Sequence, residues 1–486
     1  MTLLSSVVTL VVTIASLANA AGLCGTTRYE NKTRAFIMTD ISNEPDDQMS
    51  LVRLLTHSNE LDVVNIAVVT STWKNDSIDL NTTYAVINAY GNVVENLNNN
   101  VPAAGTYPPS DEVSKRVVAG HPVYGLAALN EATPSNASTA LVAAVDASEE
   151  PLWVLAWGGA NVLAEALNQV MNSRSEDDVA AFVRKLRVYS ISDQDDSGPW
   201  IRTNFPTLFY IVSIHGFSEY GSPTWIGISG EGIRHFDKGG PDSTIITNEW
   251  LQTNIRIGAL GTDYYPEWIY QMEGDTPSFL GLLPNGLNDP EHPEWGGWGG
   301  RYTAADASGL TGMYSDATDW VIGKNNDTFM TKYGTIWRWR QAFQYDFAAR
   351  MGWTVSAGNT TDGGVTFTGS NNHHPVVVVN GSCDTLQLSY TFGESVVFDA
   401  SESWDPDGDD LSFDWFHYRE PTMRLEGDIP RVSPNVTFNA LDGVGAVTEV
   451  TPNDNITVHV ILTVEDTRET DLPLVAYRRI ILTPTA

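Results

Sequence analysis

Four acidic residues crowd into one short stretch near the start of the chain. Asp40, Glu44, Asp46 and Asp47 lie within eight residues, directly after the apolar run at 35–38. Carboxylates packed together in a cleft repel one another unless a cation lies between them. Oxygen ligands without histidine or cysteine favour a hard ion, so the pattern indicates calcium first and magnesium second. The alternative is a solvent-exposed helix start, at which one Asp serves as the cap.

The acidic stretch lies where a strand is followed by a helix. Residues 35–39 are predicted to form a buried strand, and apolar residues then recur at helical spacing over 46–58. The alternation continues with strands over 61–71, 152–156 and 186–192 and with helices over 79–97 and 161–171. This pattern predicts an α/β domain with a mostly parallel sheet flanked by helices. Ligands bind at the carboxyl ends of strands in such sheets, which is where Asp40 falls.

The remainder of this first region and the C-terminal part differ in character. Residues 220–310 are rich in Gly, Pro and Trp and are expected to form long loops around a site. After about residue 365 the helical pattern stops, and NNHHP at 371–375 is typical of a linker. Strand-like runs follow at 375–380, 395–399, 411–418, 457–466 and 476–482. We therefore expect an α/β domain over 25–365 and a small all-β sandwich over 375–486.

Composition narrows the classes of partner. The 486 residues are enough for two or three domains, and 42% of them are hydrophobic. The formal net charge is −33, from 60 acidic and 27 basic residues. Such a charge argues against nucleic acid and against an anionic membrane surface, because both are bound through Lys and Arg. Cations and neutral sugars remain as partners.

The N-terminus and the sequons indicate export. Residues 1–20 resemble a signal peptide, with an apolar stretch at 3–17 and a small-x-small cleavage site at 18–20. No later stretch is apolar for the roughly 18 residues that a membrane span needs. The chain has nine N-x-S/T sequons, at Asn31, Asn75, Asn81, Asn136, Asn326, Asn359, Asn380, Asn435 and Asn455. A secreted, extracellular glycoprotein is therefore predicted.

The chain contains two cysteines, Cys24 and Cys383. In an oxidising compartment, one disulfide between them is the natural expectation. The alternative is two unpaired buried thiols.

Several motifs carry a resemblance to known families. RAFIMTDISNEPDD, VLAWGGANVLAEAL and the later NDP at 288–290 resemble three motifs of nucleoside hydrolases, in the same order. DISNEPDDQMSLVRLL, QDDSGPWIRTNFP and MEGDTPSFLGLLPNGLNDPEHPEWGGWGGRY resemble the cellulose-binding-protein family that has a nucleoside-hydrolase-like domain. FDASESWDPDGDDLSFDWFHY resembles the polycystic-kidney-disease-type immunoglobulin-like repeat. There Asp405, Asp407, Asp409 and Asp410 suggest a second calcium site or, alternatively, a solvated acidic turn.

The resemblance to nucleoside hydrolases implies a role for each matching residue. Asp40 would hold calcium and deprotonate its water, Asp46 would bind sugar hydroxyls, and Asp47 would be a calcium ligand. The backbone carbonyl of Ala160 and the carboxylate of Asp289 would complete the calcium site. Further sugar-binding candidates in the matching segments are Asn161, Asp195, Asp196 and Asn204.

This sequence departs from the nucleoside-hydrolase pattern at two positions where that pattern has an ionisable side chain. Met38 replaces the first Asp of the entry motif, and Asn288 stands where a His often precedes the last Asp. An Asn side chain is no acid at neutral pH, so the release of a nucleobase is not expected. Metal binding and contacts to sugar hydroxyls remain expected.

Other residues suit carbohydrate, because aromatic rings stack on sugar faces. Trp73, Trp200, His292 and Arg301 are candidates of this kind, and the alternative for each is packing within a loop. Glu273 and Asp275 in MEGDTP are either a second acid or turn formers. The leading hypothesis is a secreted, calcium-dependent hydrolase of an N- or O-linked glycosidic bond. A non-catalytic cellulose- or carbohydrate-binding protein on the same scaffold is the alternative, and an extracellular nucleoside hydrolase is a weaker one.

Overall fold

The structure is a computed structural model that describes residues 24–355, 360–362, 365–367, 371–422, 424–426, 429–432, 435–467 and 472–485. The predicted signal peptide and the sequon at Asn359 lie outside these residues. The remaining eight sequon asparagines are all exposed.

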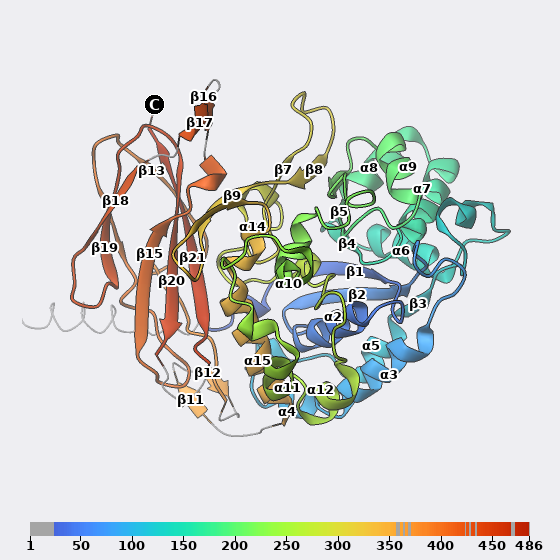
Figure 1. The fold of residues 1–486 in the computed structure, drawn as a ribbon, viewed down its shortest axis with the longest axis horizontal. Helices are drawn as coiled ribbons and strands as arrows, with labels where there is room; N and C mark the ends of the chain where they lie inside the picture. Colours follow the sequence, from blue (N-terminus) through green and yellow to red (C-terminus); the bar gives the residue numbers. More distant parts are fainter. Residues whose placement is uncertain are drawn as a thin grey trace, which may run out of the picture.

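An eight-stranded sheet forms the centre of the larger part of the chain (Figure 1). Its spatial order is β3 (Val117–Ala119), β2 (Leu61–Val68), β1 (Thr33–Thr39), β4 (Leu152–Ala156), β5 (Leu186–Ser190), β6 (Phe209–Ile211), β8 (Met313–Asp316) and β7 (Tyr302–Ala304). All neighbours are parallel except β7 and β8. The chain runs from β1 outward to β3, then returns to β4 on the other side of β1. The strand order therefore reverses at β1.

Helices cover both faces of this sheet. They are α2 (Pro45–Thr56), α3 (Leu80–Gly91), α4 (Val94–Asn98), α5 (Ser110–Lys115), α6 (Asn136–Asp146), α7 (Asn161–Ser173), α8 (Glu176–Arg184), α9 (Ser197–Asn204), α10 (Glu231–Arg234), α11 (Asn248–Asn254), α12 (Gly258–Tyr264), α13 (Pro277–Leu280), α14 (Gly334–Trp337) and α15 (Arg340–Val355). Side chains of β1 alternate between two cores, because successive strand residues point to opposite faces. Ile37 packs in the core under α2, α3 and α15, whereas Phe36 packs in the core under α6 and α7.

The C-terminal part is a β-sandwich, so the predicted fold class is confirmed. One sheet has the order β13 (Leu386–Tyr390), β21 (Val475–Pro484), β20 (Val458–Asp466) and β15 (Leu411–His417). The other has β14 (Val396–Asp399), β19 (Val447–Pro452) and β18 (Val436–Ala440). Short hairpins complete the strands: β9 (Asp319–Ile322) with β10 (Thr328–Thr331), β11 (Thr360–Asp362) with β12 (Val365–Phe367), and β16 (Arg424–Glu426) with β17 (Ile429–Val432). A separate core that contains Phe398 and Leu462 lies between the two sandwich sheets.

The segment at 371–375, which the sequence suggests is a linker, is buried at its centre. His373 and His374 are 2% and 6% exposed. His374 Nε2 lies 2.6 Å from Asp346 of α15, and its Nδ1 lies 2.8 Å from the carbonyl of Val475 in β21. These contacts connect the α/β part to the sandwich, which explains the burial.

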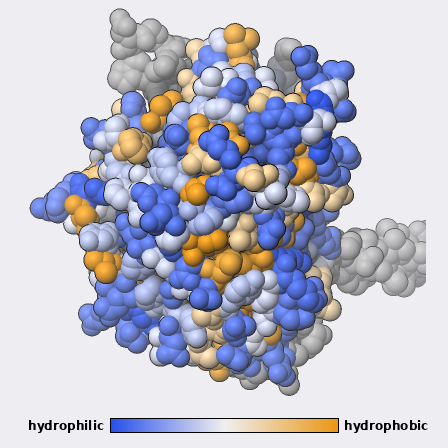
Figure 2. Space-filling view, turned by 90° about the vertical axis from the view of Figure 1, so that its right-hand side faces the viewer, coloured by the Kyte–Doolittle hydropathy of each residue, from blue (hydrophilic) through white to orange (hydrophobic). Residues whose placement is uncertain are grey.

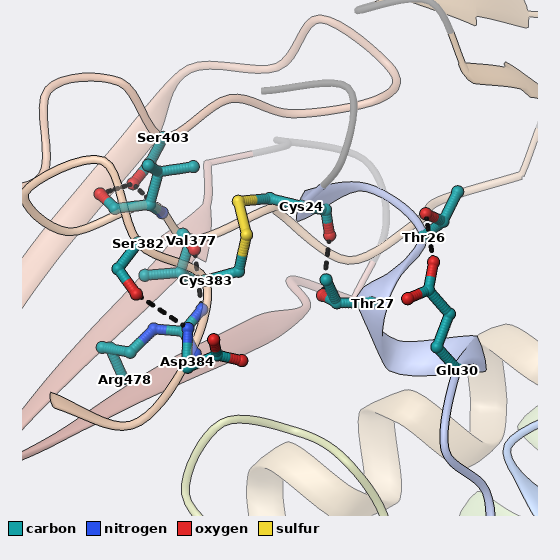
Figure 3. Close-up of a disulfide and its surroundings, with 11 residues drawn as sticks. Cys24, Thr26, Thr27, Glu30, Val377, Ser382, Cys383, Asp384, Ser403 and Arg478 are labelled. Carbon is teal, nitrogen blue, oxygen red and sulfur yellow. Dashed lines mark hydrogen bonds between the residues drawn. A yellow bond between two sulfur atoms is a disulfide. The ribbon is translucent and has the colours of Figure 1, made fainter. Parts of the chain in front are cut away.

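A disulfide joins Cys24 to Cys383, as expected, with Cα atoms 5.3 Å apart and a sequence separation of 359 (Figure 3). Cys24 lies just before β1 and Cys383 lies just before β13. The bond therefore fastens the N-terminal end of the α/β part to the start of the sandwich.

Figure 2 shows the hydropathy of the residues on one face of the molecule. Most of that face is hydrophilic, and hydrophobic residues gather near its centre. Within the described residues, no helix combines the length and apolar character needed to cross a membrane.

Candidate functional site

The acidic stretch lies at the carboxyl end of β1, the strand at which the sheet order reverses (Figure 1). Asp40 follows the last residue of β1 and is 2% exposed. Its neighbours are the ends of β2 and β4, since these strands flank β1 on either side. Open parallel sheets bind ligands at this position because the loops diverge there and leave a crevice.

The start of α2 brings two more carboxylates to this crevice. Pro45 is the first residue of α2, and Asp46 and Asp47 lie in its first turn. Asp47 is 4% exposed and accepts a hydrogen bond from the hydroxyl of Thr39, the last residue of β1. The positive end of the helix dipole favours carboxylates here, but it does not offset the repulsion between three of them.

A fourth carboxylate, Asp275, reaches the same point from a distant loop. Oxygens of Asp46, Asp47 and Asp275 all lie within 4.8 Å of one another. Gly274 makes this approach possible, because a Cβ at that position would lie 2.8 Å from Oδ2 of Asp46. The sequence left Asp275 as a second acid or a turn former, and the structure places it inside the cluster.

The loop that carries Asp275 is held by a buried ion pair. Arg53 of α2 lies 2.6 Å from Glu273, and both side chains are fully buried. Glu273 also accepts hydrogen bonds from the hydroxyls of Tyr265 and Thr276. Glu273 is therefore held by Arg53, Tyr265 and Thr276 and positions Asp275, whereas contact of Glu273 with substrate stays a prediction.

Two glycines let the loop after β4 pass close to the carboxylates. A Cβ on Gly158 would lie 2.7 Å from Oδ1 of Asp40, and one on Gly159 would lie 2.3 Å from Oδ2 of Asp195. The backbone is fixed there, because the N–H groups of Gly158 and Gly159 bond to the carbonyls of Met38 and Thr70. The motif WGGAN thus requires Gly at both positions.

Burial and mutual repulsion raise the pKa of Asp46, Asp47 and Asp275, and burial raises that of Asp40. Burial is the largest cause that raises the pKa of Asp47 well above its usual value, and the negative charges of Asp40 and Asp46 raise it further. Burial, and then the negative charges of Asp47 and Asp46, also raise the pKa of Asp275 well above its usual value. Burial together with Glu44 and Asp40 raises the pKa of Asp46 to about 7. Bringing all these groups to the ionised state at neutral pH is therefore unfavourable without a cation.

Unsatisfied oxygens indicate where a cation fits. Oδ2 of Asp40 and Oδ2 of Asp275 are buried and have no hydrogen-bond partner among the described residues. The cavity that these residues line has room of about 10 Å³, enough for one ion or water and too small for a sugar ring. An all-oxygen donor set with unpartnered buried atoms fits calcium, and magnesium less well because it demands stricter geometry.

Aromatic side chains surround the cluster. Trp157, Tyr220 and Trp225 line the same cavity, together with Trp73 at its edge. Trp73 is 58% exposed and packs edge-on against Tyr220, with ring centroids 5.9 Å apart. Tyr220 packs in the same way against Trp225 at 5.7 Å. A free aromatic face beside buried carboxylates suits the apolar face of a sugar.

Asp289, expected as the last metal ligand, does not line this cavity. It lines another, with Trp153 of β4 and Tyr189 of β5. Its neighbour Asn288 donates to the carbonyls of Leu280 and Leu283, which fixes the turn there. Asp289 therefore lies outside the acidic cavity, whereas Asp275 lies with Asp46 and Asp47.

The carbonyl of Ala160 is also occupied. Ala160 precedes α7, and its carbonyl accepts the N–H of Ala164 in the first helical turn. Its backbone N–H instead bonds to Asp195, whose Oδ2 has no hydrogen-bond partner in the described structure. Burial raises the pKa of Asp195 to about 6. Asp195 is therefore better placed than the Ala160 carbonyl to contact a ligand.

His292 and Arg301 lie away from the carboxylates. His292 stacks on Trp295, with ring centroids 3.8 Å apart, and lines the same cavity as Asp289. Arg301 is 3% exposed and lies 2.6 Å from Asp319, so its guanidinium holds the β9 region. Direct sugar contact by Arg301 is excluded by this burial.

The remaining candidates are structural in their observed contacts. Asn161 is fully buried and donates to Thr70 Oγ1. Asp196 is exposed and accepts the N–H of Leu126. Trp200 packs edge-on against Phe205, and Asn204 is an exposed residue that donates to the carbonyl of Trp200 at the end of α9. None of these four lines the acidic cavity.

Sequence reasoning did not single out Tyr220, Trp225 or Gln194, which line the cavity. Tyr220 and Trp225 lie in the region expected to be loops around a site. Gln194 donates to the carbonyl of Trp157 and follows the same strand as Asp195. In the sequence these residues are marked only by their position after a strand or inside a Trp-rich loop. Many residues without a functional role have such positions, so the sequence alone does not identify them.

A second acidic cluster lies in the sandwich. Oxygens of Asp405, Asp407 and Asp409 lie within 4.8 Å of one another. Asp405 is 4% exposed, and burial raises its pKa to about 7. Asp407 lies 2.9 Å from Nδ1 of His373. Calcium there stays a prediction.

The comparisons with known proteins agree with the fold described above. The family model described as "Cellulose-binding Sde182, nucleoside hydrolase-like domain" matches residues 34–302. The chain belongs to the Sde182 family of cellulose-binding proteins. The model of the "Cellulose-binding protein Sde0182, C-terminal domain" matches residues 395–484 of this Sde182-family chain. Comparison with curated protein sequences found no match.

Among solved structures, this Sde182-family protein is similar to a nucleoside hydrolase-related hypothetical protein from Saccharophagus degradans that is associated with carbohydrate metabolism. The identity is 31%, the match covers 94% of this chain and 100% of that one, and the TM-score is 0.72. An inosine-uridine preferring nucleoside hydrolase from Bacillus anthracis matches at 15% identity and a TM-score of 0.27, over 53% of this chain and 83% of that one.

Proposed function

We propose that the protein is a secreted, calcium-dependent hydrolase of a glycosidic bond in a carbohydrate-type substrate. One observation carries this proposal: Asp40, Asp46, Asp47 and Asp275 converge at the carboxyl end of β1 with unpartnered buried oxygens. The nucleoside-hydrolase-like fold in a cellulose-binding family supports a sugar as the substrate.

Asp47, Asp275 and Asp40 would hold the calcium ion, with Asp46 beside them. Calcium, when bound, offsets the repulsion between the carboxylates and makes a neighbouring water more acidic. Asp40 is placed to take the proton from that water. The hydrogen bond with Ser71 and the charge of Lys74 partly counter the effect of burial on the pKa of Asp40, and both favour its ionised form.

Glu44 is the group best placed to protonate the leaving atom. It lines the same cavity and is half-buried, and burial followed by the charge of Asp40 raises its pKa. In the reaction, the water oxygen bonds to the anomeric carbon while the bond to the leaving atom breaks with its electron pair. Glu44 gives its proton to that atom, and Asp40 receives one from the water.

The size of the cavity sets where the sugar ring lies. Because the space among the carboxylates fits only an ion or water, the ring must approach from the side of Trp73, whose exposed face would stack on it. Asp46, the least buried of the three aspartates in the cluster, is the one that would reach its hydroxyl groups.

The test is hydrolysis by the purified protein across a panel of oligosaccharides, aryl glycosides and nucleosides, with calcium and with a chelator. We expect the protein to cleave at least one glycoside. The chelator should abolish this cleavage, and Asp40→Asn should lower its rate by about 10²–10⁴-fold. Asp40→Asn should keep its fold, because an amide is nearly the same size as a carboxylate.

The second candidate is a non-catalytic carbohydrate-binding protein on the same scaffold. The small cavity at the carboxylates favours it, because a sugar ring does not reach them without movement of the surrounding side chains. Calcium binding by the parent together with glycan binding, but with no cleavage across the whole panel, would select this function.

A further inference from the structure

A large groove lies between the two parts of the chain, away from the acidic cavity. It has a volume of about 710 Å³ and runs between the β9–β10 hairpin, the start of α15 and strand β15 of the sandwich. Figure 1 shows β9 and α14 against the sandwich strands. The N–H of Trp320 donates to Glu420 of the sandwich, which ties the hairpin to the far wall. Both parts of the chain are needed to form this groove.

Half-buried aromatic rings line both walls. Trp320 of β9 lies on one side and Phe416 of β15 on the other. The guanidinium of Arg419 lies 5.7 Å from the centre of the Trp320 ring, and Phe416 packs against Trp339 at 6.2 Å. Beside Trp320, the side chain of Ile322 is 70% exposed. Aromatic faces held in this way need little ordering when they stack on a ligand ring.

Three polar atoms of groove-lining residues are buried without a partner. Trp339 Nε1, Arg340 Nε and His417 Nε2 have no hydrogen-bond partner among the described residues. Leaving such groups unpaired is unfavourable. These atoms are closed off from the groove itself, so the hydroxyl groups of a ligand would bond instead to the exposed side chain of Gln341, which lines the groove.

The charged side chains of the groove are already paired. Arg338 lies 3.0 Å from Asp319, Lys324 lies 3.2 Å from Asp242, and Arg340 forms a short ion pair with Glu231. Little positive charge is left for an anionic ligand, and the net charge of −33 repels one at long range. The fitting ligand is therefore uncharged, hydroxyl-rich and flat-faced.

We propose that this groove binds a neutral polysaccharide chain, with Trp320 and Phe416 as its stacking platforms. The site is separate from the acidic cavity, needs no calcium, and would hold a polymer whether or not the acidic cavity cleaves it. It therefore goes beyond the proposed hydrolase function and does not depend on it.

The test is calorimetric titration of the full-length protein with cellohexaose in the presence of EDTA, which removes calcium from the acidic cavity. The parent should bind, and Trp320→Ala should weaken binding at least tenfold. Trp320→Phe keeps a ring and should remain within about threefold of the parent. Tyr270→Ala removes another exposed aromatic residue, 62% exposed and outside the groove, and should bind like the parent.

Folding of each variant is checked by its melting temperature. If Trp320→Ala does not fold, Phe416→Leu replaces it as the test variant, because it removes the second stacking ring but keeps an apolar side chain, and it is expected to weaken binding several-fold. The proposal is overturned if the parent does not bind cellohexaose in EDTA. It is also overturned if Trp320→Ala, or Phe416→Leu where it is used, binds cellohexaose like the parent.

Discussion

The missing side chain of Gly158 leaves just enough room for Asp40: a Cβ there would lie 2.7 Å from Oδ1 and 2.9 Å from Cγ of the carboxylate. Gly158 cannot retreat, because its N–H bonds to the carbonyl of Met38 in the neighbouring strand. Nor can Asp40 easily turn away, since it follows β1 directly and is buried. The position of the proposed base therefore depends on a residue with no side chain.

Gly158→Ala should displace Asp40 and weaken calcium binding. Overpacking of this kind costs about 1–3 kcal/mol of folding free energy, so the variant should still fold. Calcium titration and thermal unfolding measure the two effects. The matched control is Gly232→Ala, since a Cβ on Gly232 has no described atom within 4 Å. Equal calcium affinity in the two variants would show that the contact is unimportant.

Stability in a chelator should fall as the pH rises from about 4 to about 7. The pKa of Asp46 is about 7 in the folded protein, against about 3.9 in an unfolded chain. Between these values the folded state binds more protons than the unfolded state, so raising the pH favours unfolding. Calcium selects the ionised form and should flatten this slope.

Thermal unfolding across this pH range, with chelator and with calcium, measures the effect. Asp46→Asn should reduce the slope in chelator, whereas Asp111→Asn, at an exposed carboxyl with 70% of its side chain accessible, should not. A parent whose melting temperature rises steadily over the window in chelator would contradict the charge repulsion described here.

Glu273→Gln should destabilise the protein and weaken calcium binding together. The change removes one charge of the buried pair with Arg53 and leaves the other unpaired, which costs about 3–5 kcal/mol. Asp275, two residues later, loses its support. Glu112→Gln is the control, because its pair with Lys115 is at the surface, where solvent screens the two charges and their pairing contributes little to stability. Denaturant unfolding compares them, and equal stabilities would refute the role assigned to Glu273.

Removal of the disulfide should lower stability without changing the sites. The double variant Cys24→Ala and Cys383→Ala opens a loop whose ends are 359 positions apart, which in the chain-entropy model costs about 6 kcal/mol. Peptide mapping of secreted protein under non-reducing conditions should recover one cross-linked peptide. Two free thiols in that material would contradict the bond and, with it, the oxidising compartment.

Local patterns predicted several strands and the acidic turn, whereas the strand expected over 375–380 forms only isolated bridges, from Val376 to Trp404 and from Val379 to Ser382. The apolar run LWVLA gives β4 with the bounds expected, because a buried parallel strand is apolar on both faces. The predicted helix over 79–97 is in fact two helices, α3 and α4, separated at Asn92 and Val93. Helical periodicity does not reveal such a break, since the apolar side chains on both sides of it face one core.

Contacts between distant segments explain what the sequence did not reveal. Asp275 joins Asp47 only because Arg53 and Glu273 pair across 220 residues, and no local pattern encodes that pairing. The sequence predicted Asp289 as a metal ligand because NDP at 288–290 follows two other motifs in the order found in nucleoside hydrolases. His374 resembled a linker residue because its partners, Asp346 and Val475, lie elsewhere in the sequence.

Calcium titration of the parent, Asp275→Ala and Asp289→Ala tests the central claim most directly, because the two variants remove a carboxylate from inside and from outside the cluster. We predict one calcium ion bound at the cluster in the parent, a loss of affinity of at least about 100-fold in Asp275→Ala, and parent-like affinity in Asp289→Ala. A parent that binds no calcium, or a loss confined to Asp289→Ala, would contradict the account.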